Sequence, residues 1–251
     1  MKLFIINTGY GMTQEELRVR VERMQQAAAP DTEIVMECME KSDICIDSQL
    51  DVALVTPEII EKGIKAQRSG FDAVGIYCTS DPGIRALREI LDIPVIGGGM
   101  AAALTAAALG YRYSMITTAA DRISEKREFL RECGLDPARI ASVRSIEYDV
   151  LAQNRNPDRE GTVRQLAKAA AECKEKDGAD VIILGCLSFA GMGKEVEAMA
   201  GIPAVDPAVA MVGLAESLCR QKLAQSGQAY CSPPARRRSW GAGTIEGGQT
   251  V

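Results

Sequence analysis

The stretch GFDAVGIYC, residues 70–78, returns later in the chain as GADVIILGC, residues 178–186. Each copy continues through a short helical segment to an Ile-Pro pair, at residues 93–94 and 202–203. The distance from the cysteine to the Ile-Pro pair is one residue longer in the second copy, because its helical segment has one extra residue. A unit repeated in this way predicts a duplicated fold, in which each copy contributes a buried strand that ends at a cysteine.

Short apolar runs alternate with segments of helical period on both sides of this repeat. Strands are predicted at residues 2–6, 32–38, 73–77, 95–96, 113–117, 142–146, 181–184 and 204–205. Helices are predicted at residues 14–28, 55–69, 82–91, 99–109, 124–133, 162–176, 194–199 and 207–224. Such alternation predicts parallel sheets covered by helices on both faces. We therefore expect an α/β protein with two pseudo-symmetric Rossmann-like lobes and an active site in the cleft between them.

The same pattern predicts the division of the chain. Lobe one is expected to cover residues 1–98 and to be completed by the C-terminal helix 207–224, and lobe two to cover residues 99–206. From residue 225 onward the periodicity is lost and Pro, Gly, Ser and Arg become frequent. This composition predicts a disordered tail over residues 225–251.

The composition excludes several kinds of chemistry. None of the 251 residues is histidine, so the chain has neither a Ser-His-Asp triad nor a two-histidine zinc site. The net charge is -5, and the Lys and Arg residues are scattered rather than clustered, which argues against a nucleic-acid surface. No apolar run is long enough for a signal peptide or a membrane span. We expect a cytoplasmic protein that acts on a small molecule, without nucleic-acid or membrane partners.

The eight cysteines are expected to be thiols in that reducing compartment. Buried cysteine is common in protein cores, and we assign a structural role to Cys38, Cys45, Cys133, Cys173 and Cys219, with Cys231 in the tail. Cys78 and Cys186 differ because each follows directly after a buried strand of the repeat. Open α/β sheets bind ligands at the carboxyl ends of their strands, where helix N-termini present N–H groups.

Two thiols on opposite sides of one crevice suit a specific reaction. Inverting a carbon that bears an acidic hydrogen requires one group to remove a proton and another to deliver a proton to the opposite face. A thiol with a pKa near 8.5 is only about 3% ionised at pH 7, so the site must stabilise one thiolate. Candidate substrate contacts are the amide and hydroxyl groups of Asn7, Thr79, Ser80, Thr117, Thr118 and Ser188. At strand ends, Asn and Thr also serve as helix caps, which is the alternative for these residues.

Three motifs carry a resemblance to a known family. They are CTSDPG at residues 78–83, SMITT at residues 114–118 and ILGC at residues 183–186. Over roughly residues 1–223 the chain resembles the aspartate/glutamate/hydantoin racemase superfamily, and most of all its hydantoin and allantoin racemases. The resemblance implies a racemase without cofactor or metal, with Cys78 and Cys186 as its acid/base pair. We expect a homo-oligomer.

Two departures from the family pattern bear on the substrate. Relatives of the hydantoin enzymes often begin Asn-Pro-Asn-Ser, whereas this chain has Asn-Thr-Gly-Tyr at residues 7–10. Amino-acid racemases usually place Thr and then His or Glu after the second cysteine, whereas Leu187 and Ser188 follow here. A substrate contact through Leu187 favours a neutral ring such as a 5-substituted hydantoin over a second carboxylate. An aspartate/glutamate-type racemase, a decarboxylase or cis-trans isomerase of the same fold, and a non-catalytic binding protein remain alternatives.

Overall fold

The computed structural model describes residues 1–155, 157–240 and 243–247. The chain forms two compact units: unit 1 contains residues 1–97 and 212–251, and unit 2 contains residues 98–211. The sequence predicts lobe boundaries after residue 98 and before residue 207. Among the described residues, no helix has the length and apolar composition needed to cross a membrane.

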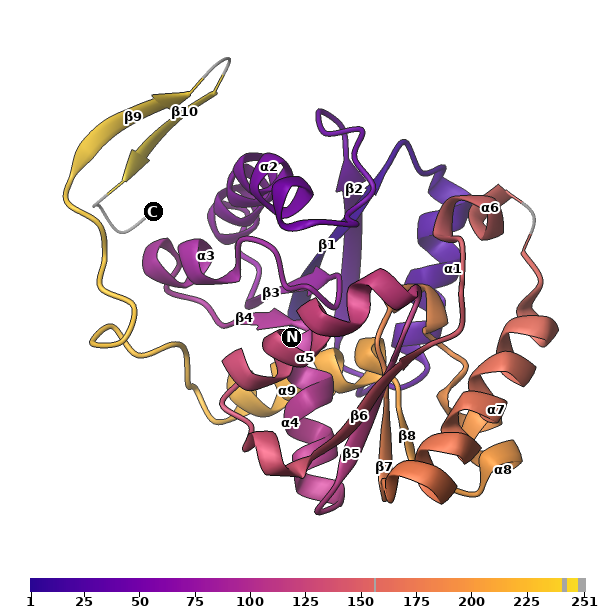
Figure 1. The fold of residues 1–251 in the computed structure, drawn as a ribbon. Helices are drawn as coiled ribbons and strands as arrows, with labels where there is room; N and C mark the ends of the chain where they lie inside the picture. Colours follow the sequence, from indigo (N-terminus) through magenta and orange to yellow (C-terminus); the bar gives the residue numbers. More distant parts are fainter. Residues whose placement is uncertain (156, 241–242, 248–251) are drawn as a thin grey trace. The chain divides into compact units, whose positions relative to one another are not determined.

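Unit 1 is built on a four-stranded parallel sheet with the order β2-β1-β3-β4 (Figure 1). The strands are β1 (Lys2–Tyr10), β2 (Glu33–Met39), β3 (Ala73–Tyr77) and β4 (Val95–Gly97). The helices between them are α1 (Gln14–Gln25), α2 (Gln49–Arg68) and α3 (Ile84–Ile90). All five residues of β3 are buried, as its unbroken apolar run predicts.

Unit 2 repeats this order as β6-β5-β7-β8, again with parallel pairing. Its strands are β5 (Tyr113–Thr117), β6 (Ile140–Ser145), β7 (Val181–Leu184) and β8 (Ala204–Val205). Its helices are α4 (Gly98–Leu109), α5 (Ile123–Glu132), α6 (Val150–Arg155), α7 (Arg159–Asp177) and α8 (Gly193–Ala200), with 3-10 turns η1 (Ala120–Arg122), η2 (Pro137–Arg139) and η3 (Leu187–Phe189). Helix α9 (Pro207–Arg220) runs from unit 2 into unit 1. Two parallel sheets of equal strand order confirm the predicted α/β fold of duplicated Rossmann-like halves.

One aspartate in each copy of the repeat fixes the amino end of its sheet. The backbone N–H of Lys2 donates to Oδ2 of Asp72 at 2.6 Å. In unit 2 the N–H groups of Tyr111 and Arg112 donate to the carboxylate of Asp180 at 3.0 and 2.9 Å. These two aspartates therefore join the turn before the third strand to the start of the first strand.

Helix α2 begins earlier than the sequence predicts. The Thr-Pro-Glu motif at residues 56–58 predicts a start there, but the helix starts at Gln49 and contains Pro57. The hydroxyl of Ser48 accepts the N–H of Asp51 at 3.2 Å and caps the true N-terminus. Pro57 removes one backbone hydrogen bond from the interior of the helix. The cap at Ser48 nevertheless lets the helix begin before this proline.

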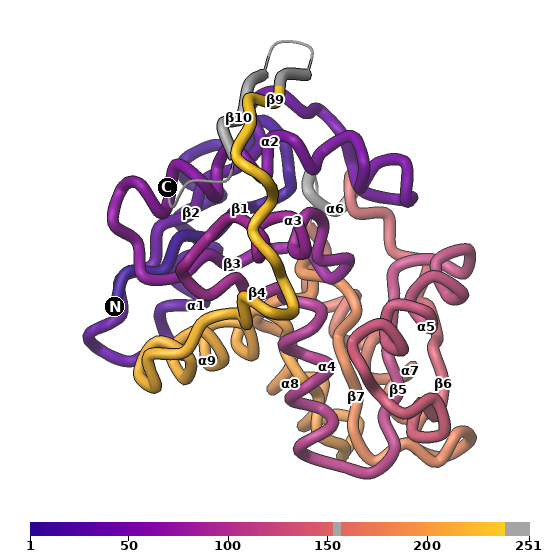
Figure 2. The backbone as a smooth tube through the Cα atoms, turned by 90° about the vertical axis from the view of Figure 1, so that its left-hand side faces the viewer, coloured from indigo at the N-terminus to yellow at the C-terminus, as the bar shows by residue number. Residues whose placement is uncertain are grey.

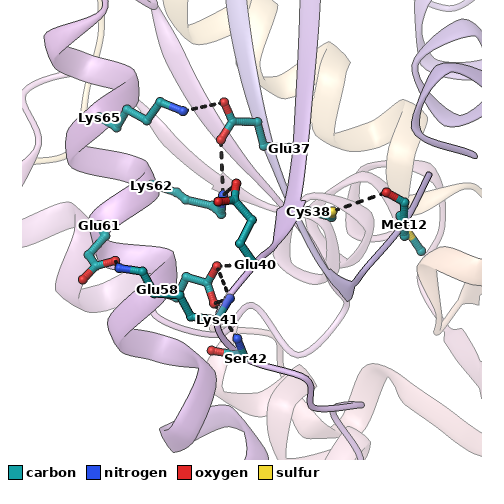
Figure 3. A network of polar contacts seen from close by, with 10 residues as sticks. All are labelled: Met12, Glu37, Cys38, Glu40, Lys41, Ser42, Glu58, Glu61, Lys62 and Lys65. Carbon is teal, nitrogen blue, oxygen red and sulfur yellow. Dashed lines mark hydrogen bonds and ion pairs between the residues drawn. The ribbon is translucent and has the colours of Figure 1, made fainter. Parts of the chain in front are cut away.

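Glu58, on the buried side of α2, holds the loop that follows β2 (Figure 3). Its carboxylate accepts backbone N–H groups from Glu40 at 2.6 Å, Lys41 at 3.1 Å and Ser42 at 2.8 Å. Burial by itself would raise the pKa of Glu58, but these N–H donors outweigh it and hold the pKa below its ordinary value. One buried carboxylate thus accepts three successive backbone N–H groups, as a neighbouring strand would otherwise do.

Replacing Glu58 by Gln is expected to lower the free energy of unfolding by about 1–3 kcal/mol at pH 7, because an anionic acceptor of several N–H bonds is lost. A carboxyl with a depressed pKa in the folded state contributes stability above its unfolded pKa of about 4.3, and that stability is lost as the pH falls. Chemical denaturation from pH 7 down to pH 3 measures this effect. The wild type should lose stability more steeply than the Glu58→Gln variant. Glu61→Gln, which breaks a surface ion pair with Lys41, is the control and should cost at most about 1 kcal/mol.

The tail differs from its predicted disorder. The side-chain amide of Gln225 donates to the carbonyls of Leu91 and Ile93, the latter at 3.0 Å. The Arg88 guanidinium donates to the Tyr230 hydroxyl at 3.1 Å and lies 5.4 Å from the centre of its ring. Figure 2 shows this segment leaving α9 and running alongside α3.

Farther along the tail, β9 (Arg236–Trp240) pairs antiparallel with β10 (Gly243–Gly247). The composition of the tail predicts no ordered structure, but Gln225 and Tyr230 contact the loop before β4 and α3, respectively, and two strands pair farther along. The predicted disorder of residues 241–242 and 248–251, and the side chain of Trp240, lie outside what the structure describes.

Candidate active site

Cys78 lies directly after β3, at the carboxyl end of the unit 1 sheet. Its sulfur accepts the backbone N–H of Ser80 at 3.5 Å. The turn is closed by the N–H of Asp81, which donates to the carbonyl of Cys78 at 3.3 Å. The thiol is partly exposed. This turn places a sulfur at the edge of the sheet with a backbone donor directed at it.

Cys186 occupies the equivalent position in the repeat of unit 2, two residues after the end of β7. It is the N-cap of η3, and its sulfur accepts the backbone N–H of Ser188 at 3.4 Å. Its carbonyl accepts the N–H of Phe189 at 3.1 Å. This thiol is partly exposed too. Both cysteines therefore lie at the carboxyl end of the third strand of their unit, are partly exposed, and accept an N–H from the residue two positions ahead.

Other cysteines lie in surroundings that favour the neutral form. Burial raises the pKa of Cys173, which is fully enclosed in unit 2. Burial also raises the pKa of Cys219, whose sulfur donates to the carbonyl of Asp72 at 3.6 Å. Sulfur chemistry is thus better supported at the ends of β3 and β7 than at these two sites.

Asn7 ends the buried part of β1 and pairs with Tyr77 in register. Its side-chain nitrogen donates to the sulfurs of Met12 at 3.3 Å and Met36 at 3.5 Å, and its oxygen accepts the N–H of Gly9 at 2.9 Å. The amide therefore stabilises the irregular end of β1, where the register with β2 shifts between Asn7 and Tyr10, which is a structural role other than the helix cap named as the alternative. A substrate contact by Asn7 stays a prediction.

The other predicted contacts of unit 1 follow Cys78 directly. Thr79 is buried and Ser80 is partly exposed. In unit 2, Thr118 and Ser188 are partly exposed, whereas Thr117 and Leu187 are buried. Each unit therefore brings its own set of predicted residues to the carboxyl edge of its own sheet.

Thr117 has an unusual environment at the end of β5. Its side-chain oxygen is buried and has no hydrogen-bond partner among the described residues. Its carbonyl accepts the N–H of Ile146 at 3.2 Å, and the neighbouring Thr118 carbonyl accepts that of Tyr148 at 2.6 Å. Buried hydroxyls are nearly always hydrogen-bonded, so this oxygen has capacity for a partner that is not part of the described chain.

The chain is similar to known proteins over most of its length. The family model described as Asp/Glu/Hydantoin racemase matches residues 5–215. The chain belongs to this racemase family. Hydantoin racemase from Pseudomonas sp. (strain NS671) is 32% identical, with 87% of this chain and 86% of the relative covered. Hydantoin racemase from Paenarthrobacter aurescens is 29% identical, with 87% and 91% covered.

Solved structures support the same family. The crystal structure of allantoin racemase from Pseudomonas fluorescens superposes with a TM-score of 0.86 at 29% identity, covering 96% of this chain and 100% of that one. A variant of arylmalonate decarboxylase superposes with a TM-score of 0.66 at 21% identity, covering 87% and 92%, which shows a shared fold alone. The racemase fold of this chain therefore also occurs in proteins of other activity.

An aromatic pair that the sequence does not predict has one member near Cys186 in the chain. The rings of Tyr148 and Phe189 meet edge to face, with centroids 5.0 Å apart and planes at 76°. Phe189 lies three residues after Cys186, so the sequence itself could have indicated that Phe189 is near this cysteine. Tyr148 comes from the loop after β6, where its N–H donates to the carbonyl of Thr118 at 2.6 Å.

No cluster of three or more His, Cys, Asp or Glu side chains suited to a metal ion occurs within residues 1–155, 157–240 and 243–247. The chemically active groups assembled at the carboxyl edges of the two sheets are thiols, hydroxyls and backbone N–H groups. Such groups can move protons and bind carbonyl oxygens.

Proposed function

We propose that this protein is a cofactor-independent racemase that inverts a chiral carbon next to a carbonyl, using Cys78 and Cys186 as its two bases. The observation that carries the proposal is the matched thiol geometry, with N–H donors at 3.5 and 3.4 Å from the two sulfurs. The family membership supports racemase chemistry. The duplicated sheets support a division of labour in which each unit supplies one thiol.

The proposed reaction is a 1,1-proton transfer. The thiolate of one cysteine takes the proton from the chiral carbon, and the electron pair of the broken C–H bond is delocalised onto the adjacent carbonyl oxygen. The thiol of the other cysteine then delivers its proton to the opposite face, which leaves a thiol where the thiolate was and a thiolate where the thiol was. Two close thiolates would repel each other, which favours the mixed state that this step needs.

The developing oxyanion needs hydrogen-bond donors that are already in place. The hydroxyl of Thr117 fits that role, because it is buried at the carboxyl end of β5 and has no partner within the described chain. Thr79, Ser80, Thr118 and Ser188 are the further substrate contacts that we propose. They lie beside the two cysteines or beside Thr117 in the chain.

The proposed substrate is a 5-substituted hydantoin or a related amino-acid derivative. Leu187 directly follows Cys186 and is buried, and an apolar side chain there gives a second carboxylate no favourable partner. The names of the relatives, hydantoin racemase and allantoin racemase, support a neutral ring of this kind. Free aspartate and glutamate are accordingly the poorer candidates.

A polarimetric panel tests this function. Purified protein is incubated with single enantiomers of several 5-substituted hydantoins, allantoin, aspartate and glutamate, and the spontaneous rate is subtracted. We expect optical rotation to decay to zero with at least one cyclic ureide and not with the free amino acids. Activity should survive chelators and should not require pyridoxal phosphate. Racemisation of aspartate or glutamate alone would contradict the proposed substrate, and no racemisation of any compound would contradict the function.

A further inference from the structure

In unit 1, Asp81 of the loop that begins at Cys78 packs against the end of β4. A Cβ atom placed on Gly97 would lie 2.1 Å from Cγ of Asp81 and 2.2 and 2.3 Å from its carboxylate oxygens. The carboxyl group therefore lies directly against the Gly97 backbone, in space that any larger residue would fill. Asp81 is 6% exposed, and its φ of 45° lies in the left-handed region, which is uncommon for residues other than glycine.

In unit 2, the loop that begins at Cys186 is anchored to the end of β8 by Asp206. Its Oδ2 atom accepts the backbone N–H of Gly191 at 2.5 Å, and its Oδ1 atom accepts that of Ala208 at 2.9 Å. A Cβ atom on Gly193 would lie 3.3 Å from Cβ of Asp206. Asp206 thus joins the cysteine loop to the end of the fourth strand and to the start of α9.

In both units an aspartate lies between the cysteine loop and the end of the fourth strand, but it comes from a different chain position in each. In unit 1 the aspartate belongs to the cysteine loop and its carboxyl group lies against Gly97 of the fourth strand, whereas in unit 2 the aspartate follows the fourth strand and accepts the N–H of Gly191 in the cysteine loop. A contact between loop and strand end that each unit makes with an aspartate from a different position supports a common requirement of the two cysteine loops. Strained conformations such as that of Asp81 persist where the surroundings enforce them.

We infer that Asp81 and Asp206 are positioning residues, which hold the loops so that the N–H groups of Ser80 and Ser188 stay directed at the sulfurs of Cys78 and Cys186. The catalytic part of this inference rests on the proposed racemase function. The positioning part does not, because it concerns the ionisation of each thiol in the free protein. Asp81 acts on Cys78 and Asp206 acts on Cys186, and each aspartate affects only the thiol of its own unit.

The test compares Asp81→Ala and Asp206→Ala with Asp72→Ala and Asp180→Ala. The control aspartates accept backbone N–H groups in the same two units, but at the amino ends of the sheets. Each folded variant is treated briefly with iodoacetamide at pH 7, and mass spectrometry gives a separate alkylation rate for every cysteine. A second set, Asp81→Asn and Asp206→Asn, keeps one oxygen acceptor and serves if an Ala variant does not fold.

We expect Asp81→Ala to slow alkylation of Cys78 by about tenfold, with Cys186 changed less than about twofold, and Asp206→Ala to do the reverse, because thiolate is the reactive form. The Asn variants keep one of the two carboxylate oxygens and should slow alkylation of the same cysteine by about threefold, and the controls should match the wild type at both cysteines. Unchanged rates at the adjacent cysteine, or equal slowing at both cysteines, would overturn the inference. If only the Asn variants fold, the inference is tested by the same comparison of the alkylation rates of Cys78 and Cys186, with a smaller expected change.

Turnover of the proposed substrate separates this inference from the proposed function. If the selective slowing is seen but the wild type racemises nothing, the positioning role stands and the proposed function fails. If turnover falls in the Ala variants while both alkylation rates stay at the wild-type values, the function stands and the positioning role is contradicted. Selective slowing together with lower kcat and a nearly unchanged KM supports both.

Discussion

Replacing Cys78 by Ser, or Cys186 by Ser, is expected to lower kcat/KM for racemisation by about a thousandfold or more, because a hydroxyl is a far weaker acid than a thiol and cannot supply the thiolate. The loss must be equal from both enantiomers, since the equilibrium constant between them is one. Polarimetry started separately from each enantiomer measures it. A single variant that keeps wild-type turnover would contradict a role for that thiol.

The double variant sharpens this prediction. Residues that act as one unit give losses that are not additive, so Cys78→Ser combined with Cys186→Ser should lose little more activity than either single variant. Cys231→Ser is the matched control, because that thiol is exposed and lies in the tail. It should keep the wild-type rate. Losses that multiply in the double variant would instead indicate two independent contributions.

Gly185→Ala is expected to have the second largest effect, on stability and on activity together. A Cβ atom at this position would lie 2.7 Å from the carbonyl oxygen of Ile116 and 2.9 Å from Cγ of Met115. The backbone of β5 cannot yield without losing the 2.8 Å hydrogen bond from the Gly185 N–H to that same carbonyl. Overpacking of this kind costs about 1–3 kcal/mol of unfolding free energy.

The same substitution would displace the next residue, Cys186. A shift of about 1 Å in a reacting group can cost about a hundredfold in rate. Chemical denaturation and kcat measured on the fraction that remains folded separate the two losses. Gly213→Ala is the control, since Gly213 lies within α9 and the added Cβ would meet no atom within 4 Å apart from the adjoining helix backbone. That variant should keep its activity and should gain up to about 1 kcal/mol in stability. If the Gly185→Ala protein were as stable and as active as the wild type, the end of β7 would have space for a methyl group, which contradicts this prediction.

The positions of the strands were the most predictable part of the fold. The runs at residues 73–77 and 181–184 are apolar without interruption, and β3 and β7 have these same bounds because both faces of an inner parallel strand are buried. The repeat also predicts that each third strand ends at a cysteine. What it does not predict is the start of α2, because the cap at Ser48 is a local hydrogen bond and Thr-Pro-Glu is the more familiar start signal.

Contacts between distant segments were the least predictable part. The tail looks disordered by composition, yet Gln225 and Tyr230 bind α3 and the loop after it. Asp81 and Asp206 escape the alignment of the repeat because the aspartate lies in the cysteine loop in unit 1 and after the fourth strand in unit 2. Self-similarity in a sequence detects residues that keep equivalent positions, and it cannot detect an equivalent contact made from different positions.

The account depends on two thiols that act on the same carbon from opposite faces. The most direct test follows the first turnovers of the wild-type protein in D2O, starting from one enantiomer with protium at its chiral carbon. Two bases predict a product enantiomer that carries deuterium, while the recovered starting enantiomer still carries protium. Protium retained in the product, or deuterium entering both enantiomers equally from the start, would indicate a single base and would contradict the account.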